Sequence, residues 1–523
     1  MVFGKNILEH LTAGMYYDSK VIFREYIQNA CDQIDVAVNE GILSEKAEGK
    51  IDIDINVKSR KVTITDNATG ISAANFRRQL EDIANSDKVL GENKGFRGIG
   101  RLCGLAYCKT LSFISTYRGE SVQSIMTIDA QKMRDMIASP IKYTAEEIIV
   151  ETAKFSHDTA PVDDHGFIVC LDDINKDNTD LLNKAEVEAY LSFVAPVPYS
   201  NKFYLRSKIY EHAKAIGHPI DEYCVYVGGN QIFKEYGMRL YSKSNSSGSK
   251  QEYDHFTDLA FYDIKKGNDL IAWMWYGLCR FEKAIPKADN PMYGFRVRQG
   301  NIQIGDNTIL VKFFKEDRGN SYFVGEVFAI SPLLIPNTYR DNFNENETRN
   351  YFEQEIKRYC YDQLNKLYNQ AAKLKAAYQK LTDYTSAVEE LEKKTSKGFV
   401  DDKEKADLTR KVVEAEQKKD EAAKIIAKIP SDNTSKEPLE IVQRAIKDHF
   451  DKKDVEKKAK QAEKKQTAVV VTQPEKPKYF TDSLSRLDKN KRKLVAQVIG
   501  IVSKHTDEAT LNAIKADLEK EFR

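Results

Sequence analysis

The chain has 523 residues, a hydrophobic fraction of 41% and a formal net charge of +1. This length allows about two to four domains, and the near-zero net charge excludes a global electrostatic attraction to nucleic acid or to an anionic membrane. The longest apolar runs, such as residues 270–276, are far shorter than the ~20 residues that a membrane helix needs.

The cysteines and the N-terminus indicate a compartment. Seven cysteines are scattered along the chain without a C-x-x-C pair, which argues against a disulfide framework or a zinc site and is typical of a reducing environment. Residues 1–11 mix polar and apolar side chains instead of forming the apolar core of a signal peptide. We therefore expect a cytoplasmic protein with no membrane partner.

Residues 1–180 alternate helical and strand patterns and predict a first α/β domain. Apolar residues at helical spacing predict one amphipathic helix over 15–38. Alternation of apolar and polar residues at period two predicts short strands. The strands expected here are 51–57 and 61–65, which form a hairpin, followed by 111–116 and 166–171.

Residues 185–346 are richer in aromatic and β-forming residues and predict a second α/β domain. Its expected strands are 223–227, 271–276 and 295–304. Trp273, Trp275 and Tyr276 are interpreted as core residues of a strand and not as an exposed binding patch.

The remaining third of the chain is predicted to be helical, which makes the whole chain an α+β protein. Residues 347–450 have very few Gly or Pro residues and predict two long helices in an antiparallel hairpin, with a break at 398–402. Residues 451–480 are expected to be a Lys-rich linker. A small helical segment is expected over 481–523, with helices at 484–504 and 508–522 and Thr506 or Asp507 as the cap of the second.

Three motifs in the first domain carry chemistry, and the first is Glu25, Asn29 and Asp32. Spacings of four and three residues place these side chains on one helical face. A carboxylate on a helix can deprotonate water, and an amide oxygen one turn away can bind Mg²⁺, which prefers oxygen ligands. For this triplet alone, a solvated helix face is the alternative.

The second motif places Asp66 where a strand runs into the small-residue turn 67–71. A carboxylate there can accept a hydrogen bond from an exocyclic amine such as that of adenine, and the alternative is an ordinary Asx turn. The third motif is the glycine segment 95–101, which leads into an apolar helix from Leu102 and suits phosphate binding by backbone N–H groups. It lacks the G-K-[ST] of a Walker loop, and no strand precedes it as in a dinucleotide fingerprint.

The order E-x-x-x-N-x-x-D, then D-x-x-x-G, then G-x-x-G-x-G resembles the Bergerat-fold ATPases, the superfamily of gyrase, heat-shock-ninety, histidine-kinase and MutL proteins. Residues 11–35, 83–88 and 165–169 are similar to stretches of the ninety-kilodalton heat-shock chaperones. The resemblance covers most of residues 1–175 and implies an α/β-sandwich domain that binds ATP with Mg²⁺ and hydrolyses it.

The resemblance also implies roles for single residues. Glu25 would be the general base, Asn29 the Mg²⁺ ligand, and Asp66 the carboxylate that reads adenine. A lid would span residues 85–101. The other nucleotide-binding residues that it implies are Asp32, Gly70, Ser86, Lys88, Gly95, Gly98, Ile99, Gly100 and Arg101.

Two positions depart from the family pattern, and one loop extends it. Ala68 replaces the first glycine of the usual D-x-G-x-G, so the turn must avoid a φ that only glycine tolerates well. Phe167 stands where the family usually has a threonine that contacts the adenine-side carboxylate.

Residues 334–341 resemble the loop that delivers an arginine to the γ-phosphate, which makes Arg340 the candidate. The alternative is a surface arginine.

Two hypotheses describe the output of this ATPase. The first is a chaperone-like homodimeric clamp that closes its N-terminal domains on ATP and acts on a client or partner protein. The second is a DNA-associated clamp resembling MutL or the microrchidia proteins, with the Lys-rich segment 451–478 contacting phosphates. The C-terminal third does not resemble the chaperone dimerisation domain. A histidine kinase is not favoured, because no helix with a phosphoacceptor His precedes the ATPase pattern.

Overall fold

The computed structural model describes residues 4–11, 18–82, 100–243, 248–428, 437–466 and 479–523. The chain divides into two compact units, Met1–Asn365 and Lys366–Arg523. The fold is α+β, as predicted, with sheets and short helices in the first unit and long helices in the second.

The first unit begins with an eight-stranded sheet, in the order β5-β4-β3-β6-β2-β1-β7-β8. All neighbours in it are antiparallel except β1 and β7, which are parallel. The strands are β1 Lys50–Asn56, β2 Lys61–Asp66, β3 Cys108–Thr116, β4 Val122–Asp129, β5 Ala153–Thr159, β6 Gly166–Ile174, β7 Cys224–Val227 and β8 Asn230–Gln231.

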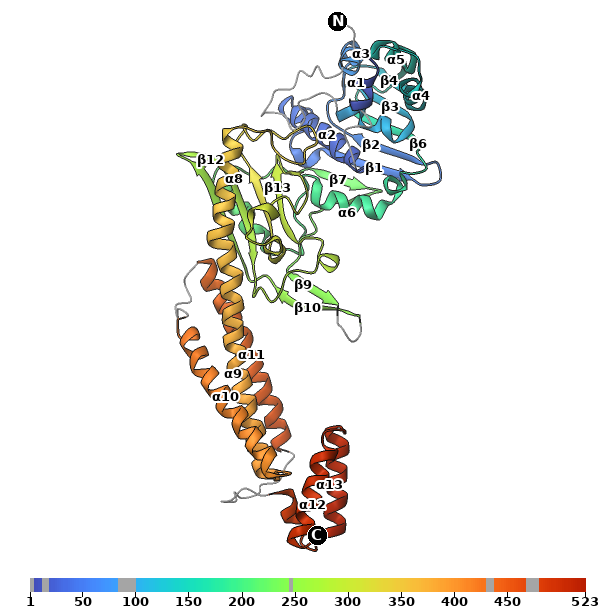
Figure 1. Cartoon of the computed structure of the whole chain (residues 1–523). Helices are drawn as coiled ribbons and strands as arrows, with labels where there is room; N and C mark the ends of the chain where they lie inside the picture. The colour runs from blue at the N-terminus through green and yellow to red at the C-terminus, as the bar shows by residue number, and fades with distance from the viewer. Residues whose placement is uncertain (1–3, 12–17, 83–99, 244–247, 429–436, 467–478) are drawn as a thin grey trace. The chain divides into compact units, whose positions relative to one another are not determined.

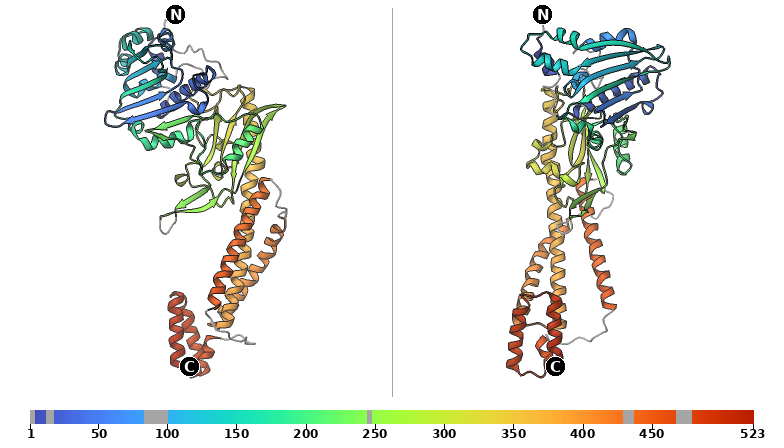
Figure 2. Two further views of the ribbon diagram at one scale, coloured as in Figure 1. Left: turned by 180° about the vertical axis from the view of Figure 1, so that it is seen from behind. Right: turned by 90° about the vertical axis from the view of Figure 1, so that its right-hand side faces the viewer.

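One face of this sheet is covered by helices, as Figures 1 and 2 show. In β1 the isoleucines Ile51 and Ile53 are buried while Asp52 and Asp54 are exposed, which is the period-two pattern of a sheet with one covered face. The helices are α1 Asn6–Leu11, α2 Val21–Asn39, α3 Ala73–Glu81, α4 Ala130–Ala138, α5 Ala145–Thr152 and α6 Lys184–Val194, with the 3₁₀ segments η2 Lys46–Glu48, η3 Gly100–Ala106 and η4 Thr179–Leu182.

A second sheet of five strands, in the order β11-β12-β15-β13-β14, completes the first unit. Trp273 and Trp275 are fully buried and Tyr276 is 1% exposed, which confirms that they are core residues. The elements of this part are α7 Arg206–Ala215, β9 Arg239–Lys243, β10 Lys250–His255, β11 Asp258–Lys266, β12 Asp269–Leu278, η5 Lys287–Asp289, β13 Gly294–Gln299, β14 Ile302–Ile304, η6 Val311–Phe313, η7 Asp317–Tyr322, β15 Val324–Ala329 and α8 Glu347–Tyr359, which the π-turn η8 Cys360–Leu364 follows.

The second unit is made of helices. The rings of Tyr378 and Phe450 stack with centroids 5.0 Å apart. A small core around Phe480, Leu484 and Ile499 holds the last two helices. Asp507 caps the last helix by accepting a hydrogen bond from the backbone N–H of Thr510 at 2.9 Å. The helices are α9 Asn365–Lys397, α10 Asp402–Ile426, α11 Pro438–Gln466, η9 Phe480–Ser483, α12 Lys489–Val502 and α13 Glu508–Phe522.

The structure differs from the sequence-based expectations at five places. Strand β7, expected in the second domain, pairs with β1 of the first sheet, because its partner strand lies 174 residues away in the sequence and no local pattern reveals it. Helix α11 extends to Gln466, so a third long helix occupies the first half of the expected linker. Helix α2 begins at Val21, and a 3₁₀ segment replaces the helix expected from Leu102. Residues 295–304 form two strands, because the chain turns at Gly300 and Asn301.

The seven cysteines are free thiols in the structure. Among the described residues, none of the helices is long and apolar enough to span a membrane. Within that same part of the chain, His, Cys, Asp and Glu do not gather in a group of three that could hold a metal ion.

Candidate functional site

The carboxylate of Glu25, in the second turn of α2, lies between two buried arginines. Arg24 donates its Nε and Nη2 hydrogens to Glu25 Oε1 at 3.2 and 3.1 Å. Arg340, from the loop after β15, places its Nε 3.7 Å from the same oxygen. All three residues are at most 8% exposed. Two parts of the chain that are 315 residues apart thus balance one buried negative charge.

Gly100 contacts the other oxygen of Glu25. A Cβ atom built on Gly100 would lie 2.6 Å from Glu25 Oε2, so a larger residue there would displace the carboxylate. The Tyr26 hydroxyl donates to the Arg101 carbonyl at 3.0 Å and accepts from the Gly104 N–H at 3.1 Å. These contacts fix η3 against α2.

Helix α2 carries more polar side chains than a core helix normally does. Asn29 is half-buried and Asp32 is 3% exposed, and both lie on the same helical face as Glu25. Gln28 is 1% exposed, and its Oε1 has no hydrogen-bond partner among the described residues. Buried polar groups are normally paired, so these polar side chains set this part of α2 apart from the apolar residues by which the helix packs in the core.

Asp66 ends β2 and is 8% exposed. Its Oδ1 accepts a hydrogen bond from the backbone N–H of Ala68 at 3.1 Å, and the N–H of Phe167 also bonds to the carboxyl. Burial raises the pKa of Asp66 to about 7, although these two N–H groups favour the carboxylate. Near neutral pH this group can therefore either donate or accept a hydrogen bond.

The two departures from the family pattern are accommodated in this turn. Ala68 is fully buried and its φ is not positive, so the missing glycine leaves no strained residue. Phe167 lies opposite Asp66 in the pairing of β6 with β2, and its backbone N–H favours the carboxylate form of Asp66.

The neighbouring backbone leaves no room for a side chain at Gly70. Its φ is +67°, and a Cβ there would lie 1.9 Å from the Thr116 carbonyl oxygen and 2.7 Å from that of Gly166. The turn therefore rests directly on the ends of β3 and β6. Any contact of Gly70 with a bound base stays a prediction.

Side chains from distant segments hold the same turn. Thr69 donates its hydroxyl to Gln33 Oε1 on α2 at 2.9 Å. Ser115, on β3 and 2% exposed, accepts the Ile71 N–H at 2.7 Å. His165 Nδ1 lies 2.7 Å from the Ala68 carbonyl oxygen. The sequence offers no signal for Gln33 or Ser115, because each is an isolated polar residue without a motif.

Arg101 points toward α3 in this structure. Its Nη2 donates to the carbonyl of Asp82, the residue that follows α3, and burial lowers the pKa of Arg101. Its role as a phosphate contact stays a prediction. Ser86, Lys88, Gly95, Gly98 and Ile99, and most of the expected lid, lie outside the described residues.

Comparison with known proteins agrees with this geometry. Residues 17–159 match the family model described as histidine kinase-, DNA gyrase B-, and HSP90-like ATPase. Residues 17–159 belong to this ATPase family. The match includes α2 and the Asp66 turn, and it ends before the second sheet, which carries Arg340.

Part of this chain is similar to the chaperone protein HtpG of Vesicomyosocius okutanii subsp. Calyptogena okutanii (strain HA). The two are 38% identical over 85 residues, which are 15% of this chain and 14% of that protein. The match thus spans only a small part of the relative's length, and the relative's activity as a whole protein is not transferred by it.

The structure brings some of the sequence-predicted residues of the ATPase-family domain into direct contact. Glu25 touches both Gly100 and Arg340, and the Asp66 turn joins the same helix through Gln33. Sequence reasoning missed Arg24, which binds Glu25 as closely as any residue does here. The signal was available, since a basic residue directly precedes the predicted base, but neighbours in a helix do not normally face one another.

Proposed function

We propose that this chain binds ATP with Mg²⁺ in its ATPase-family domain and hydrolyses it, with Glu25 as general base and Arg340 as the phosphate-binding arginine. The observation that supports this most is the buried contact of 3.7 Å between Arg340 and Glu25. A cation from the second domain thus lies beside the carboxylate that the family motif assigns to water activation, in a site with little solvent.

The proposed chemistry is an in-line attack of water on the γ-phosphorus. Glu25 takes a proton from the water as the new P–O bond forms and the bond to the β–γ bridging oxygen breaks. Arg340 stabilises the negative charge on the transferring group. Glu25 Oε1 must first lose its arginine partners, because the hydrogen bonds from Arg24 occupy the oxygen that would accept the proton.

The remaining residues would hold the nucleotide. The half-buried amide of Asn29, one turn from Glu25, suits Mg²⁺ because this cation takes oxygen ligands, and Mg²⁺ would neutralise phosphate charge. Asp66, as a carboxylate, would accept a hydrogen bond from the adenine amino group. Asp32, Gly70, Gly100 and Arg101 would line the same site.

A first experiment separates binding from turnover. Glu25→Ala is expected to lower ATP turnover by about 10²–10⁴-fold while the nucleotide dissociation constant changes little. Arg340→Ala is expected to lower turnover as well, and Arg318→Ala, at an exposed arginine of the same domain, serves as its matched control. Normal turnover in Glu25→Ala would refute the proposal.

For the output we propose a chaperone-like clamp that forms a homodimer on ATP. The similarity to HtpG over 85 residues supports it, as does the second domain that presents Arg340 to the first. Light scattering should show a doubled mass, or a more compact dimer, when a non-hydrolysable ATP analogue is added. A mass and shape that ignore the analogue would count against clamp closure.

The DNA-associated clamp is the second candidate, and α11 favours it. Lys452 and Lys453, at the start of the Lys-rich segment, are exposed on this helix, so the segment begins on a helix and not in an extended linker. This hypothesis predicts DNA binding that weakens steeply with salt and that stimulates ATP turnover. Suppression of client aggregation without any DNA effect would favour the chaperone.

A further inference from the structure

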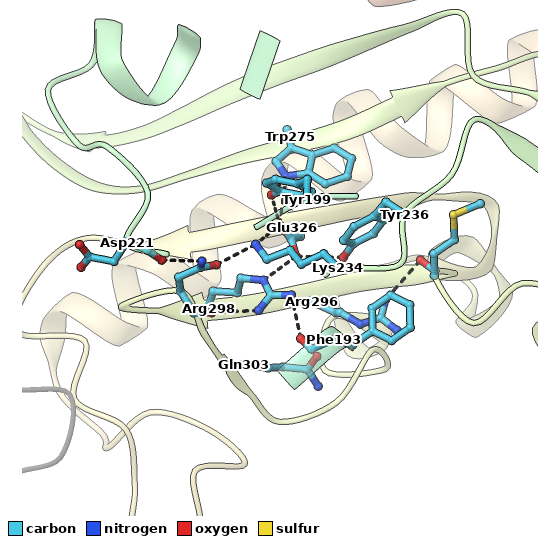
Figure 3. Close-up of polar contacts among 12 residues, drawn as sticks. Phe193, Tyr199, Asp221, Lys234, Tyr236, Trp275, Arg296, Arg298, Gln303 and Glu326 are labelled. Atoms are coloured by element: carbon cyan, nitrogen blue, oxygen red, sulfur yellow. Dashed lines mark hydrogen bonds and ion pairs between the residues drawn. The ribbon is translucent and has the colours of Figure 1, made fainter. Parts of the chain in front are cut away.

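A fully buried group of charges lies in the first unit, away from Glu25. Glu326 on β15, Arg298 on β13 and Lys234 are each 0% exposed. Arg298 Nε lies 2.5 Å from Glu326 Oε1, and Lys234 Nζ lies 3.3 Å from Oε2. Asn301 accepts from Lys234 at 2.7 Å. We call Lys234, Arg298, Asn301 and Glu326 the junction cluster. Figure 3 labels Lys234 and Arg298 beside the Glu326 side chain.

The junction cluster connects the two sheets. Arg298, Asn301 and Glu326 belong to the five-stranded sheet and its β13–β14 turn. Lys234 follows β8, the last strand of the eight-stranded sheet. Arg298 Nη2 donates to the Phe193 carbonyl in the last turn of α6 at 2.8 Å, and Asn301 Nδ2 donates to the Asp221 carbonyl, just before β7, at 2.7 Å.

Such a cluster is a poor choice for stability alone. Removing charges from water is costly, and apolar residues of the same volume are often equally or more stabilising. Burial by itself would raise the pKa of Glu326, but Arg298 and Lys234 outweigh it and lower that pKa to about 2. Hydroxyl groups of Tyr199 and Tyr236 also donate to the carboxylate. Ion pairs hold their side chains in fixed directions, which apolar contacts do not do. The cluster therefore fixes the orientation of the segments that carry it.

The β13–β14 hairpin connects the junction cluster to Arg340. Asn301 forms the turn of this hairpin, with a φ of +61°. Directly after β14, the Gly305 N–H donates to the Arg340 carbonyl at 2.8 Å. On the other strand, Gln299 Nε2 donates to the Leu334 carbonyl at 2.9 Å, where the Arg340 loop begins. The hairpin that the cluster anchors is therefore the support of the Arg340 loop.

A second set of contacts connects the segment before β7 to α2. Lys46 Nζ lies 2.8 Å from both Asp35, on α2, and Asp221. The Tyr223 hydroxyl donates to Asp35 at 2.7 Å. Since Asn301 binds the carbonyl of Asp221, the segment before β7 is tied to the helix of Glu25 on one side and to the hairpin of Arg340 on the other.

We propose that the junction cluster is a positioning device, which sets the distance between Arg340 and Glu25 by locking the β13–β14 hairpin to α6 and to the segment before β7. The inference rests on the proposed function, because it gives the cluster its effect on turnover. The cluster residues act on turnover through Arg340, so they are positioning residues.

Asn301→Gly is the sharpest test. Glycine accepts the φ of +61° without strain, so the backbone is kept while both side-chain bonds are lost. Glu326→Gln is the second variant, and Asp173→Gly, at a half-buried position outside the junction cluster with a φ of +52°, is the matched control. Each variant is made in the full chain, with and without Arg340→Ala, and ATP turnover, KM and melting temperature are measured.

We expect Asn301→Gly to lower kcat about tenfold or more, since misplacement of a group by an ångström is costly, with KM unchanged within twofold. In the Arg340→Ala background, the same change should lower kcat no further, because its effect passes through Arg340. Asp173→Gly should leave kcat unchanged in both backgrounds.

Two results would overturn the inference. Equal losses of kcat with and without Arg340 would show a general weakening of the fold, and an unchanged kcat in folded Asn301→Gly would show that the hairpin needs no anchor. Wild-type turnover in Arg340→Ala alone would instead overturn the proposed role of Arg340 and remove the basis of the inference with it.

Discussion

At the scale of single residues, Glu25 is notable for its partners. A buried carboxylate is tolerable only when it is paired, and here Arg24 and Arg340 supply the pairing. The same contacts occupy the oxygen that the proposed general base would use. Under the proposed mechanism the described arrangement is therefore a resting one, in which stability of the site and readiness for catalysis oppose each other.

Asp66 supports a prediction about pH and base recognition. Its pKa of about 7 means that the carboxylate becomes protonated as the pH falls below 7. An amino group prefers the ionised carboxylate as its hydrogen-bond acceptor. We expect the affinity for ATP relative to inosine triphosphate, which carries a carbonyl in place of the amino group, to fall between pH 8 and 6. The ratio, measured by calorimetry, changes by at most tenfold per pH unit.

The comparison of two nucleotides is the control, since their phosphates titrate alike. A ratio that is constant across this range would contradict the assignment of Asp66 to the amino group.

The raised pKa of Asp66 also makes the stability of the fold depend on pH. The folded state holds a proton on Asp66 between pH ~4 and 7 that the unfolded state has lost, so its contribution to the free energy of unfolding is full below pH ~4 and is lost as pH rises to 7.

At the scale of elements, the turn between β2 and α3 positions Asp66. Ser115, His165 and Gln33 bind it from β3, from the start of β6 and from α2. Gly70 allows the turn to rest on the backbone of β3 and β6. The position of the carboxylate therefore depends on three elements at once, and a change in the turn should affect stability as well as binding.

Gly70→Ala is expected to destabilise the first unit by more than about 2 kcal/mol. The left-handed φ costs an alanine roughly 1–2 kcal/mol, and the Cβ would also overlap the Thr116 carbonyl oxygen at 1.9 Å. Gly119→Ala is the matched control, because Gly119 has a φ of +93° but open space around it. Urea unfolding measures both, and equal losses would show that the overlap is relieved without cost.

At the scale of the whole molecule, the chain divides into two units, and the boundary between residues 365 and 366 falls within the sequence of α9. The site residues described for nucleotide binding, Glu25 and Asp66 among them, all lie in the first unit, as does Arg340. Binding of a ligand to one folded unit stabilises that unit by mass action. The two units should therefore respond differently to ATP.

Scanning calorimetry of the full chain is expected to show two transitions. A non-hydrolysable ATP analogue at about 100 times its dissociation constant should stabilise the first unit by about 2.7 kcal/mol and leave the transition of the helical unit unchanged. Asp66→Asn should abolish the shift. A parallel shift of both transitions would contradict the assignment of the site to the first unit.

Much of the local structure follows from the sequence itself. The β1–β2 hairpin, the buried Trp273 and Trp275, the break at 398–402 and the Asp507 cap are each specified by patterns within a few residues. These features depend on side-chain periodicity, on turn residues and on one capping oxygen, which are local interactions. The ATPase family, likewise, could be inferred because its motifs lie in a fixed order along the chain.

Only the tertiary structure decided which distant segments meet. The parallel pairing of β7 with β1, the contact of Arg340 with Glu25 and the junction cluster all join residues that are far apart in the sequence. Ser115 and Glu326 carry no local signal, since the role of a polar residue is set by what burial brings beside it. Periodicity shows that a side chain will be buried, but the partner that balances its charge is determined by the packing of the two sheets.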